Sequence, residues 1–120
     1  MTPFEKSFAV AFSRLLLIVS APVAHAHAYL SHASPSGGSA LSAAPQEVTL
    51  TFTDTLEAAF SKLTVTDANG TEVSQDKAQV NANVMRVGLK PLSVGIYKVN
   101  WRAVSTHKTE GNFTFSVGPH

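Results

Sequence analysis

His27 carries the clearest chemistry in this chain, provided that the polypeptide is cut just before it. The segment ahead of it ends in Ala24-His25-Ala26, which has the small-residue signature of a signal-peptide cleavage site. Cleavage after Ala26 leaves His27 with a free α-amine beside its imidazole, so that one residue supplies two nitrogen ligands. Among divalent first-row metals, copper generally binds nitrogen ligands most tightly, so the expected metal ion is copper(II).

Residues 1–26 have the layout of a secretory signal peptide. Lys6 and Arg14 precede the apolar run 15–19, and small residues lead from there to the cleavage signature. The apolar stretch 15–23 is far short of the roughly 20 residues that span a bilayer, so a removed signal is expected rather than a membrane anchor. We therefore predict that the domain is secreted.

Two neighbouring cleavage positions would change this chemistry. A cut after Ala24 exposes His25-Ala26-His27, a chain start that binds copper(II) through deprotonated backbone amides and needs no folded partner. Pro22 would then lie three residues before the cut, where a small residue is preferred, so this position ranks second. A cut after Ala28 exposes Tyr29 and abolishes the chelate.

The remaining segment, 27–120, is predicted to form one small domain. A chain of this length buries a modest core and removes roughly two-thirds of its unfolded surface from water. The sequence contains no cysteine, so neither disulfides nor thiolate ligands are available. Loss of Lys6, Arg14 and Glu5 with the signal leaves equal numbers of basic and acidic residues. That balance gives no indication of nucleic acid or an anionic membrane as partner.

Alternation of apolar and polar residues predicts β-strands along most of this domain. The clearest alternating stretches are 48–53, 62–66, 85–89, 97–103 and 113–117. Asn69-Gly70 is a strong turn signal, and no segment has a convincing helical pattern beyond one turn at 56–61. Short strands separated by turn residues predict an all-β fold, an immunoglobulin-like Greek-key antiparallel β-sandwich or barrel.

Four histidines remain after processing, and one of them is the predicted partner of the terminus. His107 lies in the polar stretch 105–111, a connection between the last two strands, and a loop held by paired strands positions a ligand well. A loop histidine is usually a solvated surface residue, but the His27 terminus supplies two nitrogens and needs a third. His32 and His120 are interpreted as solvated or terminal residues.

These residues resemble the CopC-type periplasmic copper-binding proteins, which include the PcoC and YobA groups. The resemblance covers nearly the whole domain from His27 onward, and its specific parts are the stretches 50–54, 95–105 and 111–115. It implies a Greek-key β-sandwich that binds copper in the periplasm for resistance, buffering or delivery, without catalysis. The implied protein is a monomer whose partners are the copper ion and an inner-membrane copper transporter of the CopD type.

The resemblance also assigns metal ligands to this chain. His27 matches the N-terminal histidine of the family, His107 matches its loop histidine, and Asp54 falls where some members carry a glutamate that could be a weak or axial ligand. The family usually places an aspartate two residues before the loop histidine, whereas here the stretch 104–107 lacks it. We therefore expect weaker copper(II) binding than in a complete member, or a site completed by water.

The methionine-rich copper(I) site of the family cannot form in this chain. Met85 is the one methionine left after the signal is removed, and its alternating strand predicts a position in the core. This departure implies the branch of the family that binds copper(II) alone.

Two other classes of protein stay open on the sequence. A copper-dependent oxidative enzyme, such as a lytic polysaccharide monooxygenase, also uses an N-terminal histidine with a second histidine on a β-sandwich. The short chain and the lack of an aromatic-rich substrate face argue against it. The other class is an immunoglobulin-like accessory domain whose histidines bind no metal.

Overall fold

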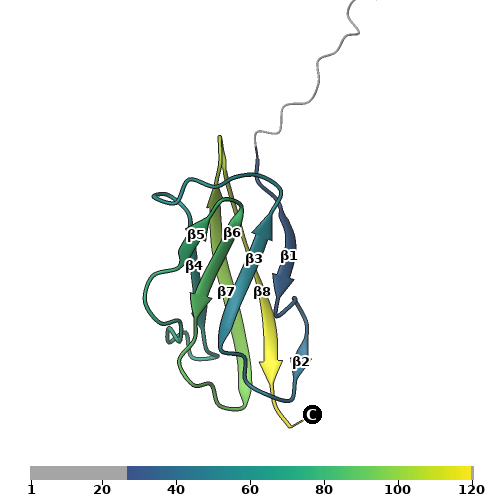
Figure 1. The fold of residues 1–120 in the computed structure, drawn as a ribbon. Coiled ribbons are helices and arrows are strands. Elements are labelled where there is room, and N and C mark those ends of the chain that lie inside the picture. Colours follow the sequence, from purple (N-terminus) through teal and green to yellow (C-terminus); the bar gives the residue numbers. More distant parts are fainter. Residues whose placement is uncertain (1–26, 120) are drawn as a thin grey trace, which may run out of the picture.

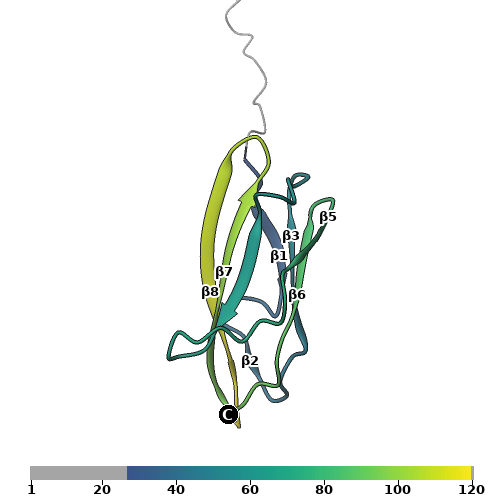
Figure 2. The same cartoon turned by 90° about the vertical axis from the view of Figure 1, so that its left-hand side faces the viewer.

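Two four-stranded sheets face each other in residues 27–119, the part of the chain that this computed structural model describes (Figures 1 and 2). The expected signal peptide, 1–26, and His120 lie outside the described residues. The strands are β1 (Leu30–Ser34), β2 (Ala40–Leu41), β3 (Glu47–Phe52), β4 (Lys62–Thr66), β5 (Gln79–Asn81), β6 (Val84–Gly88), β7 (Gly95–Val104) and β8 (Lys108–Val117). Within 27–119 there is no helix with the length and apolar character to cross a membrane.

The strand order is β1-β3-β6-β5 in one sheet and β2-β8-β7-β4 in the other. All neighbours run antiparallel except the two-residue strand β2, which pairs in parallel with β8. The predicted all-β Greek-key sandwich is therefore confirmed, with this one parallel pair as a departure. Figure 2 shows the two layers nearly edge-on, with β7 and β8 in one layer and β1, β3, β5 and β6 in the other.

The core lies between the sheets and is built from the apolar positions of the alternating stretches. Phe52 of β3 and Phe115 of β8 are each 1% exposed, and Met85 is fully buried as predicted. Trp101 is half-buried and packs its ring against Phe52 at a centroid distance of 5.1 Å in an edge-to-face arrangement. Alternation works here because successive side chains of a strand point to opposite faces of the sheet.

The hairpin of β7 and β8 is longer than the sequence pattern indicated. The stretch 105–111 was predicted as a connection, but pairing continues to Val104 and Lys108, so that residues 105–107 alone form the turn. Backbone hydrogen bonds carry this extension, and they do not require apolar side chains. Gly111 lies opposite Trp101, and a Cβ at Gly111 would come within 2.6 Å of the indole ring.

Three further strands, β1, β2 and β5, were not predicted. All three are at the edges of their sheets. Edge strands expose much of their surface, and β1 and β5 accordingly lack a fully buried residue. Their side chains therefore show little of the alternation by which central strands are recognised.

One end of the sandwich gathers the segments that carry the predicted ligands. The hairpin turn 105–107 lies at this end, next to the point where the described chain begins and close to the connection from β3 to β4 (Figure 1). The Glu57 amide joins two of these segments by donating a hydrogen bond to the Val104 carbonyl at 2.7 Å. The fold thus brings together segments that are far apart in the sequence.

Candidate metal centre

The first described residues form a short arm that is fastened to both sheets. Ala28 is fully buried, and its carbonyl accepts a hydrogen bond of 2.7 Å from the Thr109 hydroxyl of β8. The next residue, Tyr29, donates its amide to the Thr53 hydroxyl at 2.9 Å, and its carbonyl accepts the Thr53 amide at 2.9 Å. His27 therefore stands beside two consecutive residues that are held in place.

The fastened arm places His27 against the hairpin turn. The centroids of the His27 and His107 rings are 5.0 Å apart, and the ring planes are inclined by 34°. His107 belongs to a tight turn in which the Ser105 amide donates to the His107 carbonyl at 3.1 Å. Both histidines are exposed, so an ion can reach them from solvent.

The ring separation fits two imidazoles that share one metal ion. Metal-to-imidazole bonds are about 2.0 Å, and a ring centre lies roughly 1.2 Å further out, so two bound rings have centres about 4.5 Å apart at a right angle and about 6.4 Å apart when opposite. The observed 5.0 Å lies inside this range and near its lower limit. The pair can thus hold an ion with its two ring nitrogens in adjacent positions.

Asp54 contacts the hairpin turn through Ser105. Its Oδ2 accepts a long hydrogen bond of 3.4 Å from the Ser105 hydroxyl, and its Oδ1 accepts the Thr55 amide at 3.1 Å. Across residues 27–119, no three side chains from histidine, cysteine, aspartate or glutamate converge as a metal-binding group. The structure therefore brings together His27 and His107, and it places Asp54 against the hairpin through Ser105.

Tyr29 is the residue at this end that the sequence reasoning did not consider as part of the site. Its ring centroid lies 6.0 Å from that of His27, and the residue is 61% exposed. The one sequence feature that points to Tyr29 is its position two residues after His27. His32, in contrast, is an exposed residue of β1, in agreement with its interpretation as solvated.

Fold and site together define a class: small all-β sandwich domains with two imidazoles at one end, which suit a transition metal. The CopC domain matches residues 30–118, and the chain belongs to the CopC family. Relatives include proteins named for copper resistance and for copper transport.

Individual proteins match between 78% and 98% of this chain. Protein YobA of Escherichia coli (strain K12) is 32% identical over 123 residues, which cover 98% of this chain and 99% of YobA. The copper transport protein CutJ of Bacillus subtilis (strain 168) is 36% identical over 111 residues, which cover 87% of this chain and 20% of CutJ. The crystal structure of CopC from Methylosinus trichosporium OB3b superposes with a TM-score of 0.72 at 32% identity, covering 78% of this chain and 96% of that one.

Proposed function

We propose that this protein is exported to the periplasm, cut after Ala26, and binds a copper(II) ion between its new N-terminus and the hairpin turn. The observation that carries the proposal is the pairing of His27 with His107. Their rings are 5.0 Å apart although the residues are separated by most of the domain sequence. Membership of the CopC family supports copper as the metal.

Cleavage after Ala26 supplies the third nitrogen ligand of the proposed site. In the full chain the His27 backbone nitrogen belongs to the peptide bond with Ala26, and it becomes an α-amine when that bond is cut. The amine, the His27 imidazole and the His107 imidazole then offer three nitrogens, which suit copper(II). All three bind only in their deprotonated forms, so copper binding releases protons and weakens as the pH falls.

Asp54 is proposed as the oxygen donor of the site, weak or axial in character. Its hydrogen bond with Ser105 keeps the carboxylate against the turn that carries His107. Because no group of three ligand side chains converges within residues 27–119, Asp54 is proposed to act through a bridging water or at a long distance. The site is accordingly proposed to bind copper(II) less tightly than family members with an aspartate in the loop.

The cargo is proposed to be handed to a copper transporter of the inner membrane by a monomer that catalyses no reaction. Exposure of both histidines supports this, because an acceptor can approach the ion at the end of the sandwich. CutJ supports it as well, since a domain similar to this chain makes up a fifth of that copper transport protein. One metal site then serves buffering, resistance and delivery, which differ only in the acceptor.

Copper(II) titration of two N-terminal forms and two variants tests the proposal. The chain that begins at His27 is expected to bind one equivalent, and both an extra alanine before His27 and His107→Ala are expected to weaken binding strongly. His32→Ala is the matched control, because this histidine is exposed on β1 and is expected to leave the affinity unchanged. Equal affinity of the chain that begins at His27 and the alanine-extended chain would refute the N-terminal chelate.

A further inference from the structure

The outer face of the β4-β7-β8 sheet carries a concentration of positive charge. On these strands the buried residues alternate with outward-facing ones, and the outward-facing set includes four cations. The register aligns Lys62 with Arg102 and then with Glu110, while Lys98 and Lys108 lie further along the same face. We call this surface, made of Lys62, Lys98, Arg102, Lys108 and Glu110, the basic face.

The net charge of the domain does not reveal this positively charged surface. Beyond the signal, the sequence has equal numbers of basic and acidic residues, yet the basic face combines four cations with one carboxylate. The Lys108–Glu110 pair is 3.9 Å long with both side chains 56% exposed, so solvent screens it. Lys62, Lys98 and Arg102 form no ion pair with any residue of 27–119. Glu72 and Asp76 line an adjoining depression with Lys62, Lys77 and Arg102, and with these residues included the cations still outnumber the carboxylates.

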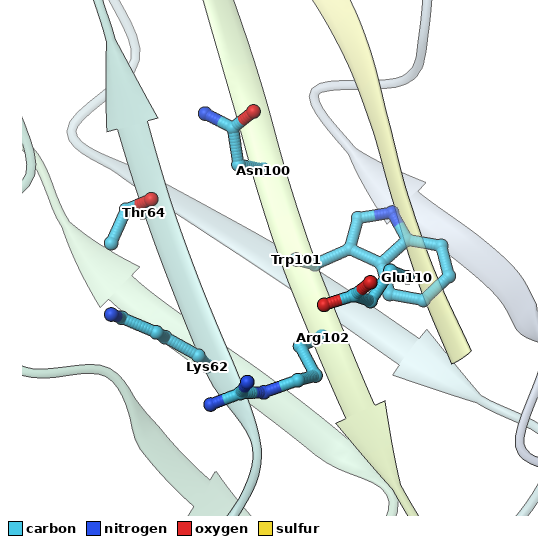
Figure 3. A pocket seen from close by; sticks show the side chains of 6 residues that line it. All are labelled: Lys62, Thr64, Asn100, Trp101, Arg102 and Glu110. Atoms are coloured by element: carbon cyan, nitrogen blue, oxygen red, sulfur yellow. The ribbon is translucent and has the colours of Figure 1, made fainter. Parts of the chain in front are cut away.

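The middle of the basic face is hollowed and lined by polar groups. A shallow depression of about 280 Å³ is bordered by Lys62, Thr64, Asn100, Trp101, Arg102 and Glu110. Figure 3 shows Lys62 of β4 and Arg102 of β7 side by side on this face, with Thr64 and Asn100 further along the strands. Arg102 is held by a hydrogen bond of 3.2 Å from its Nε to the Phe60 carbonyl. Two cations beside hydroxyl and amide groups suit the phosphate of a lipid headgroup.

Exposed apolar side chains stand at both ends of the basic face. Ile96 is 59% exposed and has the same outward register as Lys98, two residues further along β7. Phe60 is 61% exposed and lies next to the Arg102 end of the face, through the hydrogen bond to its carbonyl. Cations interspersed with exposed large apolar groups are the pattern by which surfaces bind the interface of a bilayer.

We propose that the basic face binds the surface of a membrane that contains anionic phospholipid. A fluid bilayer can match cations spread over three strands, because its headgroups rearrange, whereas an acidic protein would need carboxylates at fixed matching positions. The apolar side chains at the two ends favour a bilayer for the same reason. Lys108 follows His107 directly, so a domain docked in this way keeps the histidine end beside the membrane surface.

Flotation with lipid vesicles tests this inference, using the metal-free chain that begins at His27. Binding is expected to vesicles containing phosphatidylglycerol, absent with phosphatidylcholine alone, and lost as salt rises from about 0.05 M to about 0.5 M, where screening shortens the range of charge interactions. Each cation near an anionic surface contributes about fivefold to partitioning, so Lys62→Gln with Lys98→Gln is expected to weaken binding about 25-fold. Arg86→Gln with Lys90→Gln removes the same charge outside the basic face and is expected to have little effect.

Further measurements distinguish binding to lipid from binding to other anions. Ile96→Ser is expected to lower vesicle binding without changing its salt dependence, provided that thermal melting shows an intact fold. The inference is wrong if phosphatidylglycerol vesicles are not bound, or if both charge-removal pairs weaken binding equally. It is also wrong if polyglutamate or inorganic phosphate binds while vesicles do not. No copper is present in these measurements, so their outcome does not depend on the proposed metal site.

Discussion

Thr109→Val removes the hydrogen bond that fastens Ala28 to β8, together with a longer contact of 3.4 Å from the same hydroxyl to the Ala103 carbonyl. Valine keeps the shape of threonine but has no hydroxyl, so the Ala28 carbonyl loses the donor that lies 2.7 Å away. Ala28 is fully buried, and within residues 27–119 its carbonyl accepts no other hydrogen bond. The variant therefore tests whether holding the arm is what holds His27 against His107.

The size of the effect follows from the burial of that carbonyl. Leaving a buried acceptor without a partner costs about 1–3 kcal/mol, which corresponds to a factor of about 5–150 in an equilibrium constant. Copper affinity can fall by no more than this factor, because the change acts only through the ordering of the arm. We expect copper(II) to bind Thr109→Val about tenfold more weakly, within that range.

Competition against a copper chelator, together with electron paramagnetic resonance, measures both affinity and ligand set. Thr109→Val is expected to show fewer coordinated nitrogens, because the His27 chelate survives while His107 is no longer held beside it. Thr109→Ser keeps the hydroxyl and is expected to restore both readouts. The reasoning is refuted if Thr109→Val folds and binds copper as tightly as the parent, or if Thr109→Ser is as weak as Thr109→Val.

Three further predictions concern the core and the metal. Gly111→Ala is expected to destabilise the fold by about 1–3 kcal/mol, because its Cβ would meet the Trp101 ring at 2.6 Å; urea unfolding followed by Trp101 fluorescence measures this, and an unchanged midpoint would contradict it. Phe52→Ala removes a ring that is 1% exposed, and a loss of about 3–5 kcal/mol is expected in the same assay. Copper affinity is expected to be lower at a pH of about 5 than at about 7, because protons compete for the nitrogens; isothermal titration at both values checks it, and equal affinities would exclude an imidazole and amine site.

The sequence and the structure agree for the central strands and for the edge strand β4, and they disagree at the other three edge strands. The alternation around Leu50 and Val99 identified β3 and β7, because a central strand must bury one face and the pattern records it. The short strands β2 and β5 show little alternation of this kind. The connection around His107 was predicted too long for a related reason, since backbone pairing extends β7 and β8 through polar residues.

The candidate site shows the same division between local and tertiary information. His27 could be singled out from the sequence, because a cleavage signature and a chelating residue type are both local features. His107 was predicted as its partner from its place between the last two strands and from the family resemblance, and the structure places its ring 5.0 Å from that of His27. Asp54 was predicted as an oxygen donor from the family resemblance, and the structure places its carboxylate within hydrogen-bonding distance of the Ser105 hydroxyl. The direction in which a turn points its side chains depends on pairing across the whole domain.

By itself the sequence predicted the class of fold and an N-terminal chelate, and it established the absence of cysteine and of a methionine cluster, because composition, periodicity and cleavage signals are properties of contiguous residues. The tertiary structure alone decided which residues meet. It buried Ala28 under the Thr109 hydroxyl, paired His27 with His107, and aligned four cations on one face of a domain with balanced charge. Each of these contacts joins residues far apart in the chain, and only the register between strands sets such distances.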